Sequence, residues 1–200
     1  MKRKLILLAT FLFLSWVGTA GAVTLSIDPA FQNVGVGGTA SVNLNISGLG
    51  SDNDNTLGGF ILDVGFDNSI LAFDSAVFGP TLDLYTDPSD PIYNNYSVDQ
   101  FSPDTVSLYW VTFLDTADLI ANQLDSFVLA TLKFTGIGLG TSSLTFDYID
   151  LSNGDGTGSI FADGTAGSVT VAPVPEPSTW LLMAMGLVGL VGARRKFVKS

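Results

Sequence analysis

Apolar and polar residues alternate over much of the chain, so that every second residue of several short runs is apolar. In one such run Val42, Leu44 and Ile46 alternate with Asn43 and Asn45. Successive side chains of a β-strand point to opposite faces of the sheet, so this pattern is typical of strands that bury one face. We predict such strands at 23–27, 42–46, 60–66, 70–73, 106–113, 127–134, 143–149 and 167–171.

The segments between these runs are rich in Gly, Asn and Asp, which favour turns, and no stretch between the two termini has a convincing period of 3.6 residues. The pattern therefore predicts an all-β fold, an antiparallel β-sandwich of about eight or nine strands. Leu44 and Leu62 should lie in its core. The run 106–113 is apolar on both faces, which predicts a central strand covered on both sides. Residues 116–125 form either one helical turn or a loop.

Residues 79–104 interrupt the regular spacing of the strands. They contain four prolines, together with Tyr85, Tyr93, Tyr96 and Phe101. One interpretation is a long surface loop whose aromatic rings pack back on the edge of the sandwich. The other makes these four aromatic residues a ligand-contacting platform, because aromatic rings stack on the apolar faces of sugars.

The first 22 residues have the parts of a secretory signal peptide. A cluster of three cations opens the chain, residues 5–17 are apolar, and the Ala-Gly-Ala sequence at 20–22 offers a small-residue cleavage site. Cleavage there would leave a mature chain that starts at Val23, with the sandwich domain over 23–172. The alternative is an uncleaved anchor, which the short apolar run disfavours.

The C-terminal part of the chain predicts a linker followed by a membrane anchor. Residues 173–179 are rich in proline, which lacks a backbone donor and holds a stiff, extended linker. Residues 180–200 contain an uncharged apolar run and then a basic tail, which would stay on the cytoplasmic side of a membrane. The run is short for a bilayer, which needs about 20 residues, and this shortness suits a temporary transmembrane helix.

The order of these parts resembles the PEP-CTERM sorting signal of exported proteins in Gram-negative bacteria that make exopolysaccharide. The matching residues are Pro175, Glu176, Pro177, Arg194 and Arg195. The resemblance implies recognition by an exosortase. The protein would be anchored transiently in the inner membrane with its domain in the periplasm, and then released to the cell surface or an extracellular matrix. The alternative is an ordinary C-terminal anchor behind a proline-rich hinge.

The charge of the domain narrows the possible partners. The segment 23–172 contains eighteen Asp and no Glu, and its one cation is Lys133, so its net charge is −17. Such a surface repels nucleic acid and anionic headgroups. The whole chain contains no Cys and no His. This excludes disulfides, thiolate catalysis and the usual neutral-pH general base, and it limits any metal to a hard, oxygen-bound cation such as Ca²⁺.

Two loops rich in Asp, Asn and Gly are candidates for such a calcium site. Asp52 and Asp54 lie in the first loop, and Asp150, Asn153 and Asp155 lie in the second, where glycines separate the oxygen-bearing side chains. Alternate side chains can converge on a cation while glycines turn the backbone. The second loop lacks the Glu that closes an EF-hand. The other interpretation is that these residues simply form turns.

The domain resembles a cohesin-like module of the carbohydrate-binding superfamily. The matching segments are 23–26, 37–44, 58–67, 70–74, 128–134 and 167–171. The resemblance implies a jelly-roll sandwich of nine strands that binds dockerin modules or acts in adhesion. No dockerin-like repeat occurs in this chain, and the aromatic segment after residue 78 departs from the compact cohesin pattern.

These observations favour an exported, non-enzymatic module that binds a glycan or a protein partner in the cell envelope or exopolysaccharide matrix. A purely structural matrix protein is the first alternative. A glycan hydrolase that uses paired carboxylates is the second, although the domain has no Glu, the commoner general acid.

Overall fold

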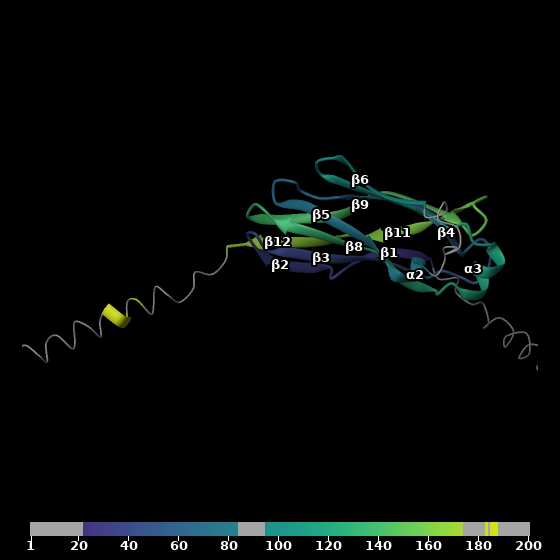
Figure 1. Cartoon of the computed structure of the whole chain (residues 1–200), viewed down its shortest axis with the longest axis horizontal. Helices are drawn as coiled ribbons and strands as arrows, with labels where there is room; N and C mark the ends of the chain where they lie inside the picture. Colours follow the sequence, from purple (N-terminus) through teal and green to yellow (C-terminus); the bar gives the residue numbers. More distant parts are fainter. Residues whose placement is uncertain (1–21, 84–94, 174–182, 184, 188–200) are drawn as a thin grey trace, which may run out of the picture.

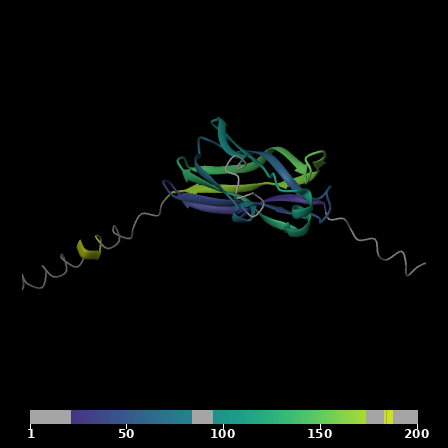
Figure 2. The same ribbon diagram turned by 45° about the vertical axis from the view of Figure 1, so that its right-hand side comes forward.

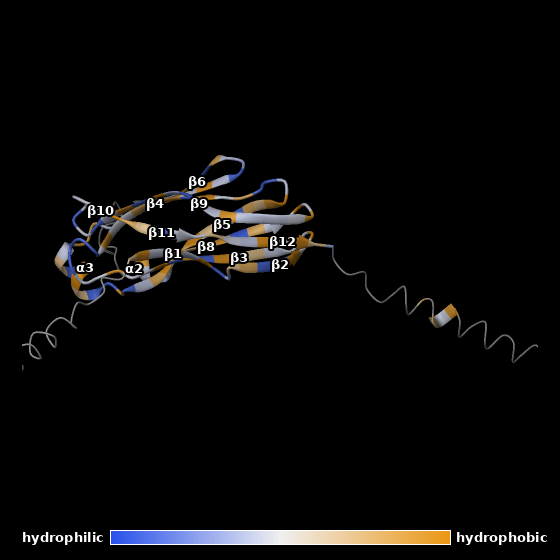
Figure 3. Ribbon diagram, turned by 180° about the vertical axis from the view of Figure 1, so that it is seen from behind, coloured by the Kyte–Doolittle hydropathy of each residue, from blue (hydrophilic) through white to orange (hydrophobic). Residues whose placement is uncertain are grey.

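The alternation seen in the sequence is realised as strands with one buried face. Figure 3 shows the hydropathy of the residues along these strands. The computed structural model describes residues 22–83, 95–173, 183 and 185–187. Strand β3 (Thr39–Ser47) is an example, because Ala40, Val42, Leu44 and Ile46 are buried and the residues between them are not. The prediction that Leu44 and Leu62 lie in the core is confirmed, since neither side chain is exposed to solvent.

Two sheets packed face to face form the domain (Figures 1 and 2). The first sheet has five strands in the order β11-β1-β3-β8-β5. Besides β3 it contains β11 (Ala162–Thr165), β1 (Val23–Asp28), β8 (Ser126–Gly136) and β5 (Leu71–Phe78).

The second sheet has seven strands, six of them in the order β2-β12-β9-β4-β7-β6, with β10 paired to β9 off this path. Its members are β2 (Phe31–Gly35), β12 (Gly167–Ala172), β9 (Gly140–Asn153), β4 (Leu57–Gly65), β7 (Thr105–Val111), β6 (Asn95–Ser102) and β10 (Ser159–Ile160). The all-β sandwich predicted from the sequence is thus confirmed.

Both sheets contain one parallel pair at an edge, which the sequence did not predict. β1 pairs in parallel with β11 in the first sheet, and β2 pairs in parallel with β12 in the second. The chain passes from the first sheet to the second between β1 and β2, and again between β11 and β12. Each end of the domain therefore contributes one strand to each sheet. The start of β1 and the end of β12 lie at opposite ends of the long axis (Figure 1).

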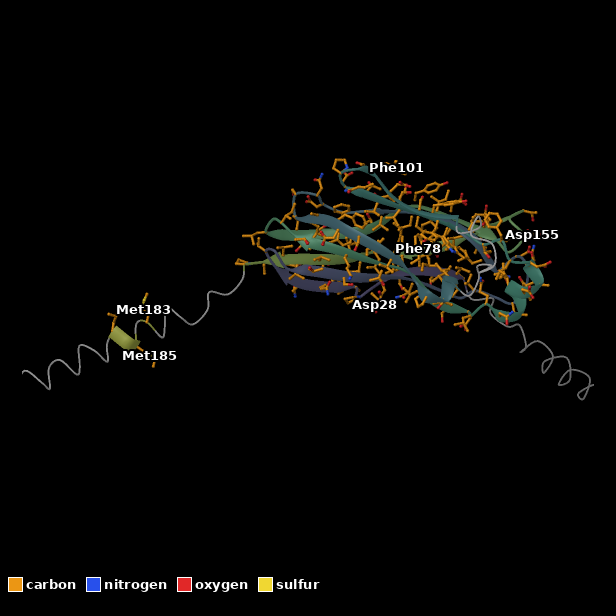
Figure 4. The ribbon with its side chains drawn as sticks, viewed as in Figure 1. Asp28, Phe78, Phe101, Asp155, Met183 and Met185 are labelled. Atoms are coloured by element: carbon orange, nitrogen blue, oxygen red, sulfur yellow. The ribbon has the colours of Figure 1, made fainter. Side chains whose placement is uncertain are left out.

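A chain of aromatic rings joins the two layers near the β5 and β6 edges. Phe60 of β4 stacks on Trp110 of β7, with 5.9 Å between the ring centroids. Phe78 of β5 contacts Phe60 at 6.2 Å and Tyr96 of β6 at 5.2 Å. Figure 4 shows Phe78 between the sheets. These contacts fix the positions of the edge strands β5 and β6.

Two short helices complete the described fold: α2 (Pro80–Asp83) and α3 (Thr116–Asn122). Asp115 caps α3, because its side chain accepts a hydrogen bond from the backbone N–H of Ala117. Gln123 follows α3, and its side-chain amide makes two hydrogen bonds to the backbone of Leu57 in β4. Gln123 Nε2 donates to the Leu57 carbonyl oxygen at 2.9 Å, and Gln123 Oε1 accepts from the Leu57 N–H at 2.7 Å. Of the two possibilities for residues 116–125, a helical turn or a loop, the structure shows a helix.

Two expectations about strands need correction. Residues 79–104 are not one loop, because the segment contains α2 and the strand β6. The run 106–113 is not covered on both sides either. It ends as a strand at Val111, and a two-layer sandwich has no third layer to cover the outward-facing Tyr109 and Val111, which are only partly buried. The predicted signal helix at 1–22 lies almost entirely outside the described residues, as does most of the predicted transmembrane helix at 180–200.

Candidate functional site

The outward-facing residues of β9, β4, β7 and β6 form a surface that we call the outer face. Ile61 of β4 pairs with Tyr109 of β7 and with Asp150 of β9, and two residues along the strand Asp63 pairs with Tyr148 of β9. Residues that pair directly across antiparallel strands point to the same side of the sheet. The outer face comprises Gly59, Ile61, Asp63, Ser97, Asp99, Ser107, Tyr109, Val111, Tyr148, Asp150 and Ser152.

A shallow hollow of about 280 Å³ lies in the outer face, lined by Ile61 and Tyr109 among others. Gly59 makes room for it, because it places no side chain beside Ser152 and Val111. A Cβ atom at position 59 would lie 3.0 Å from the carbonyl oxygen of Trp110 and 3.1 Å from Oγ of Ser152. The hollow thus combines an apolar lining with close access to polar groups.

The charged groups of the outer face are all acidic. Asp63, Asp99 and Asp150 lie on three different strands of this face. The one cation of the domain, Lys133, is exposed on β8 of the other sheet. A surface with acidic groups around an apolar centre attracts cationic groups and repels anionic ones. The outer face is therefore electrostatically suited to a positively charged partner.

The opposite surface, formed by the first sheet, is chemically different. Its outward residues are mostly Ser, Thr and Asn, and several bond to one another. Thr131 Oγ1 donates to Asn43 Oδ1 at 2.7 Å, and the hydroxyl groups of Thr24 and Ser47 lie 2.8 Å apart. Polar groups that are already paired offer less to a ligand, so this surface is the weaker candidate for a binding site.

The structure brings the two predicted cation loops together at the α3 end of the sandwich, where Figure 4 labels Asp155. Asn53 Nδ2 of the first loop donates to Asp155 Oδ2 of the second at 3.0 Å. The backbone N–H of Gly154 donates to the Asn53 carbonyl oxygen at 3.2 Å. Asn53 Oδ1 is buried and has no hydrogen-bond partner. Among the described residues it is the one buried side-chain polar atom in this state.

The carboxylates of these loops also serve as turn acceptors. Asp155 Oδ1 accepts from Thr157 Oγ1 at 2.6 Å and from the Thr157 N–H at 3.0 Å. These hydrogen bonds hold the pKa of Asp155 below its usual value, and the bond from the Thr157 hydroxyl has the largest effect. Asn53 and Asn153 make smaller contributions. Asp52 Oδ1 likewise accepts from the backbone and the side chain of Asn55. Both loops are therefore Asx-type turns.

The other predicted calcium ligands lie in different surroundings. Asn153 is buried and accepts from the Gly158 N–H at 2.9 Å, Asp54 is exposed, and Asp150 lies on the outer face. Within the described residues, no group of three or more acidic side chains is placed to hold a metal ion. The calcium site remains a prediction.

Of the four predicted ligand-contacting aromatic residues, the described part of the chain contains Tyr96 and Phe101, both on β6. Tyr96 packs on Phe78 and is about half exposed at 54%. Phe101, also on β6, is 83% exposed. Tyr85 and Tyr93 lie outside the described residues. So do the sorting residues Pro175, Glu176, Pro177, Arg194 and Arg195.

Apart from Asp150, which was predicted as a calcium ligand, the residues of the outer face were not predicted from the sequence. A signal was present, because Tyr109 and Val111 are apolar residues on the second face of a strand. We interpreted them as covered, whereas in a two-layer fold such residues form an exposed apolar surface. Which strands would bring acidic groups beside them depends on the pairing of β4 with both β7 and β9, which alternation alone does not specify.

Comparison with known proteins separates the two parts of the chain. Residues 173–196 match the PEP-CTERM protein-sorting motif. No curated protein matches the chain. Within the described residues, no helix has the length and apolar character needed to cross a membrane.

Solved structures similar to the domain are cohesins. The sixth cohesin of scaffoldin B from Acetivibrio cellulolyticus, solved with a dockerin, has a TM-score of 0.60 and 18% identity, covering 76% of this chain and 100% of that one. The seventh ScaB type I cohesin from Pseudobacteroides cellulosolvens has a TM-score of 0.59 and 21% identity, covering 78% and 96%. A non-cellulosomal cohesin from Archaeoglobus fulgidus has a TM-score of 0.54 and 16% identity, covering 78% and 95%. The protein thus carries a PEP-CTERM sorting motif behind a β-sandwich domain with the cohesin fold.

Proposed function

We propose that this protein is an exported, non-enzymatic binding module that holds a cationic protein partner on its outer face. The observation that carries the proposal is the apolar hollow at Ile61 and Tyr109, bordered by Asp63 and Asp150 on a surface without a cation. Protein interfaces commonly bury an apolar centre with aromatic residues and use complementary charge at the rim to select the partner.

The comparisons support a protein as the partner. Cohesins with this fold have been solved in complexes with dockerins, among them cohesins from Acetivibrio cellulolyticus and Clostridium thermocellum. The identities of 18% and 11% show a shared fold and leave the partner of this chain to be identified by experiment. Phe101 lies outside the outer face, so a glycan ligand stacked on it would occupy a separate site.

We propose a location that follows from the sorting motif. The PEP-CTERM match indicates an exported protein that is sorted to the cell envelope. In the proposed sequence of events, an exosortase processes the C-terminal anchor while the domain lies in the periplasm, and the domain then reaches the cell surface or the extracellular matrix. A binding face at the surface of the domain would be available to partners at each stage.

The test is affinity capture of envelope proteins from the producing cells on the immobilised exported protein. We expect one partner to be retained by wild type, to elute as the salt concentration rises, and to be lost with Tyr109→Ala and weakened by Asp150→Asn. Salt should act because it screens the charges at the rim. With the partner purified, Tyr109→Ala should raise Kd at least about tenfold, as removal of a central aromatic anchor commonly does.

Asn43→Ala on the opposite face is the matched control and should bind like wild type. Thermal melts of all three variants would show that each is folded. Equal loss of binding in Tyr109→Ala and Asn43→Ala would contradict the proposal, because the outer face would then have no special role. Hydrolysis of a polysaccharide by wild type, abolished by a single Asp→Asn change, would favour the glycan hydrolase instead.

A further inference from the structure

A second hollow, of about 620 Å³, opens between the edge strands β5 and β6. It belongs to the side of the sandwich, where the two sheets meet, and it shares no residue with the outer face. Phe73 and Leu71 contribute to it from β5, Gln100 and Phe101 from β6, and Asn68 from the turn before β5. Its volume lies in the range of about 300–1,000 Å³ that is usual for small-molecule sites.

A β-bulge turns Phe101 into this hollow. Asp99 pairs with Ser107 and Ser102 pairs with Thr105, so two residues of β6, Gln100 and Phe101, lie opposite the single residue Val106 of β7. Bulges re-aim side chains and are frequent beside functional sites. Phe101 is 83% exposed, and Figure 4 shows it at the rim of the molecule.

The β5 side of the hollow is bulged as well. Phe73 pairs with Phe134 and Ser75 pairs with Lys133, so Asp74 is an extra residue on β5. Bulged edges resist the addition of another strand, because the extra residues break the regular row of backbone donors and acceptors. The two edges that border the hollow are therefore poorly suited to an extended peptide.

The lining combines aromatic rings with neutral polar groups. Phe73 is held in place by an edge-on contact with Phe134, with 5.8 Å between the ring centroids. Gln100 Nε2 donates to the carbonyl oxygen of Pro103 at 3.0 Å, which fixes the amide and leaves its Oε1 available. Asn68 adds a second amide whose side chain makes no hydrogen bond to another described residue.

The lining contains no charged side chain, although the domain carries eighteen Asp. An uncharged site in such a domain disfavours a cationic ligand, which would gain more from the outer face. The negative field around the hollow disfavours an anionic ligand. Aromatic faces bury the apolar C–H surface of a sugar ring, while amides bond its hydroxyl groups.

We propose that this hollow binds a neutral polysaccharide, with one sugar ring packed between Phe101 and Phe73 and its hydroxyl groups bonded by Asn68 and Gln100. The inference rests on the proposed function only in taking the domain to be a binding module. The site, the ligand and the residues are separate from those of the outer face, so either proposal can fail alone.

The test is affinity electrophoresis of the exported protein in gels that contain a soluble neutral polymer, with laminarin, xyloglucan and dextran as the neutral probes and alginate as the anionic one. We expect at least one neutral polymer to retard wild type and alginate to leave it unaffected. Phe101→Ala should weaken the retarding interaction at least about tenfold, because one exposed stacking surface is removed. Gln100→Ala and Asn68→Ala should each weaken it by less.

Phe161→Ala is the matched control, because Phe161 is 91% exposed and lies outside the hollow. It should bind like wild type, and so should Tyr109→Ala, which tests the outer face alone. The proposal is overturned if no neutral polymer retards wild type, or if Phe101→Ala and Phe161→Ala bind equally. It is also overturned if Phe101→Ala abolishes capture of the protein partner and leaves polysaccharide binding unchanged.

Discussion

Gly59 shows how one residue can shape a candidate binding surface. The strand around it alternates as expected, with Phe60 and Leu62 buried and Ile61 facing outward. At position 59 a side chain would crowd Ser152 and the backbone of Trp110. The sequence gives no sign of this crowding, because the close approach of β7 and β9 on both sides of β4 is visible only in the folded sheet.

The assignment of strand faces can be tested at single residues. Leu44→Ala or Leu62→Ala should lower the free energy of unfolding by roughly 2–5 kcal/mol, because each removes a fully buried side chain and leaves a cavity. Thr24→Ala and Asn43→Ala should each change it by less than about 1 kcal/mol, since both are partly exposed and make one polar contact. Chemical denaturation measures all four. Similar losses in the two pairs would mean that the faces are wrongly assigned.

At the scale of strands and loops, the sequence predicted those elements whose two faces differ. Most of β3, β4 and β8 lies within predicted runs. Buried apolar residues recur at every second position in each of these strands, around Leu44, Leu62 and Leu132 respectively. The sequence did not predict β2 and β6, whose residues have no clean alternation. β2 is an edge strand with the exposed Phe31, and β6 is interrupted by its bulge at Phe101. Edge strands bury little, so their sequences are weakly constrained.

The two parallel strand pairs, β1 with β11 and β2 with β12, could not be predicted from the alternation of the sequence either. Alternation reports which face of a strand is buried, and it does not report which neighbour the strand pairs with. β1 and β12 alternate like the central strands, but their parallel partners, β11 and β2, lie far away in the chain. Nearness in the chain predicts antiparallel neighbours, and the long-range pairing of the two ends of the domain follows only from closing both sheets.

The two Asp-rich loops give a test at the same scale. Asn53 and Asp155 hold the loops together in the described structure, and Asn53 Oδ1 remains an unpaired oxygen beside them. If Ca²⁺ binds where the loops meet, it should stabilise the folded state by RT ln(1 + [L]/Kd), about 2.7 kcal/mol at a hundredfold excess over Kd. The melting temperature should then rise more with Ca²⁺ than with Na⁺ at equal ionic strength.

Asp155→Ala should remove most of the extra rise caused by Ca²⁺, whereas Asp63→Ala, an acidic residue on the outer face, should preserve it. Mg²⁺ should have a smaller effect, because it requires tighter octahedral geometry and loses water reluctantly. An equal shift with Ca²⁺ and Na⁺ would mean that both ions only screen the repulsion among the Asp residues. The loops would then act as turns alone, as their hydrogen bonds to Thr157 and Asn55 already allow.

At the scale of the whole molecule, the two proposed binding sites and the sorting motif lie in different parts of the chain. The start of β1 and the end of β12 lie at opposite ends of the sandwich (Figure 1), and the sorting motif follows β12. The outer face and the hollow at Phe101 lie along the body of the domain, between these two ends. A domain tethered through its C-terminal end would therefore leave both candidate sites open to the surroundings.

The sorting motif can be tested by following the release of the protein from the membrane. Replacing Pro175, Glu176 and Pro177 together by alanine should leave the protein in the membrane fraction, because an exosortase that reads these residues could no longer process the anchor. Immunoblots of the membrane and extracellular fractions measure the distribution. A chain truncated before Pro173 is the control, since it lacks the anchor but retains the whole sandwich up to Ala172, and it should be free of the membrane. If the triple variant is released as efficiently as wild type, recognition of this motif does not direct release, and the C-terminal segment is better described as an ordinary anchor behind a proline-rich hinge.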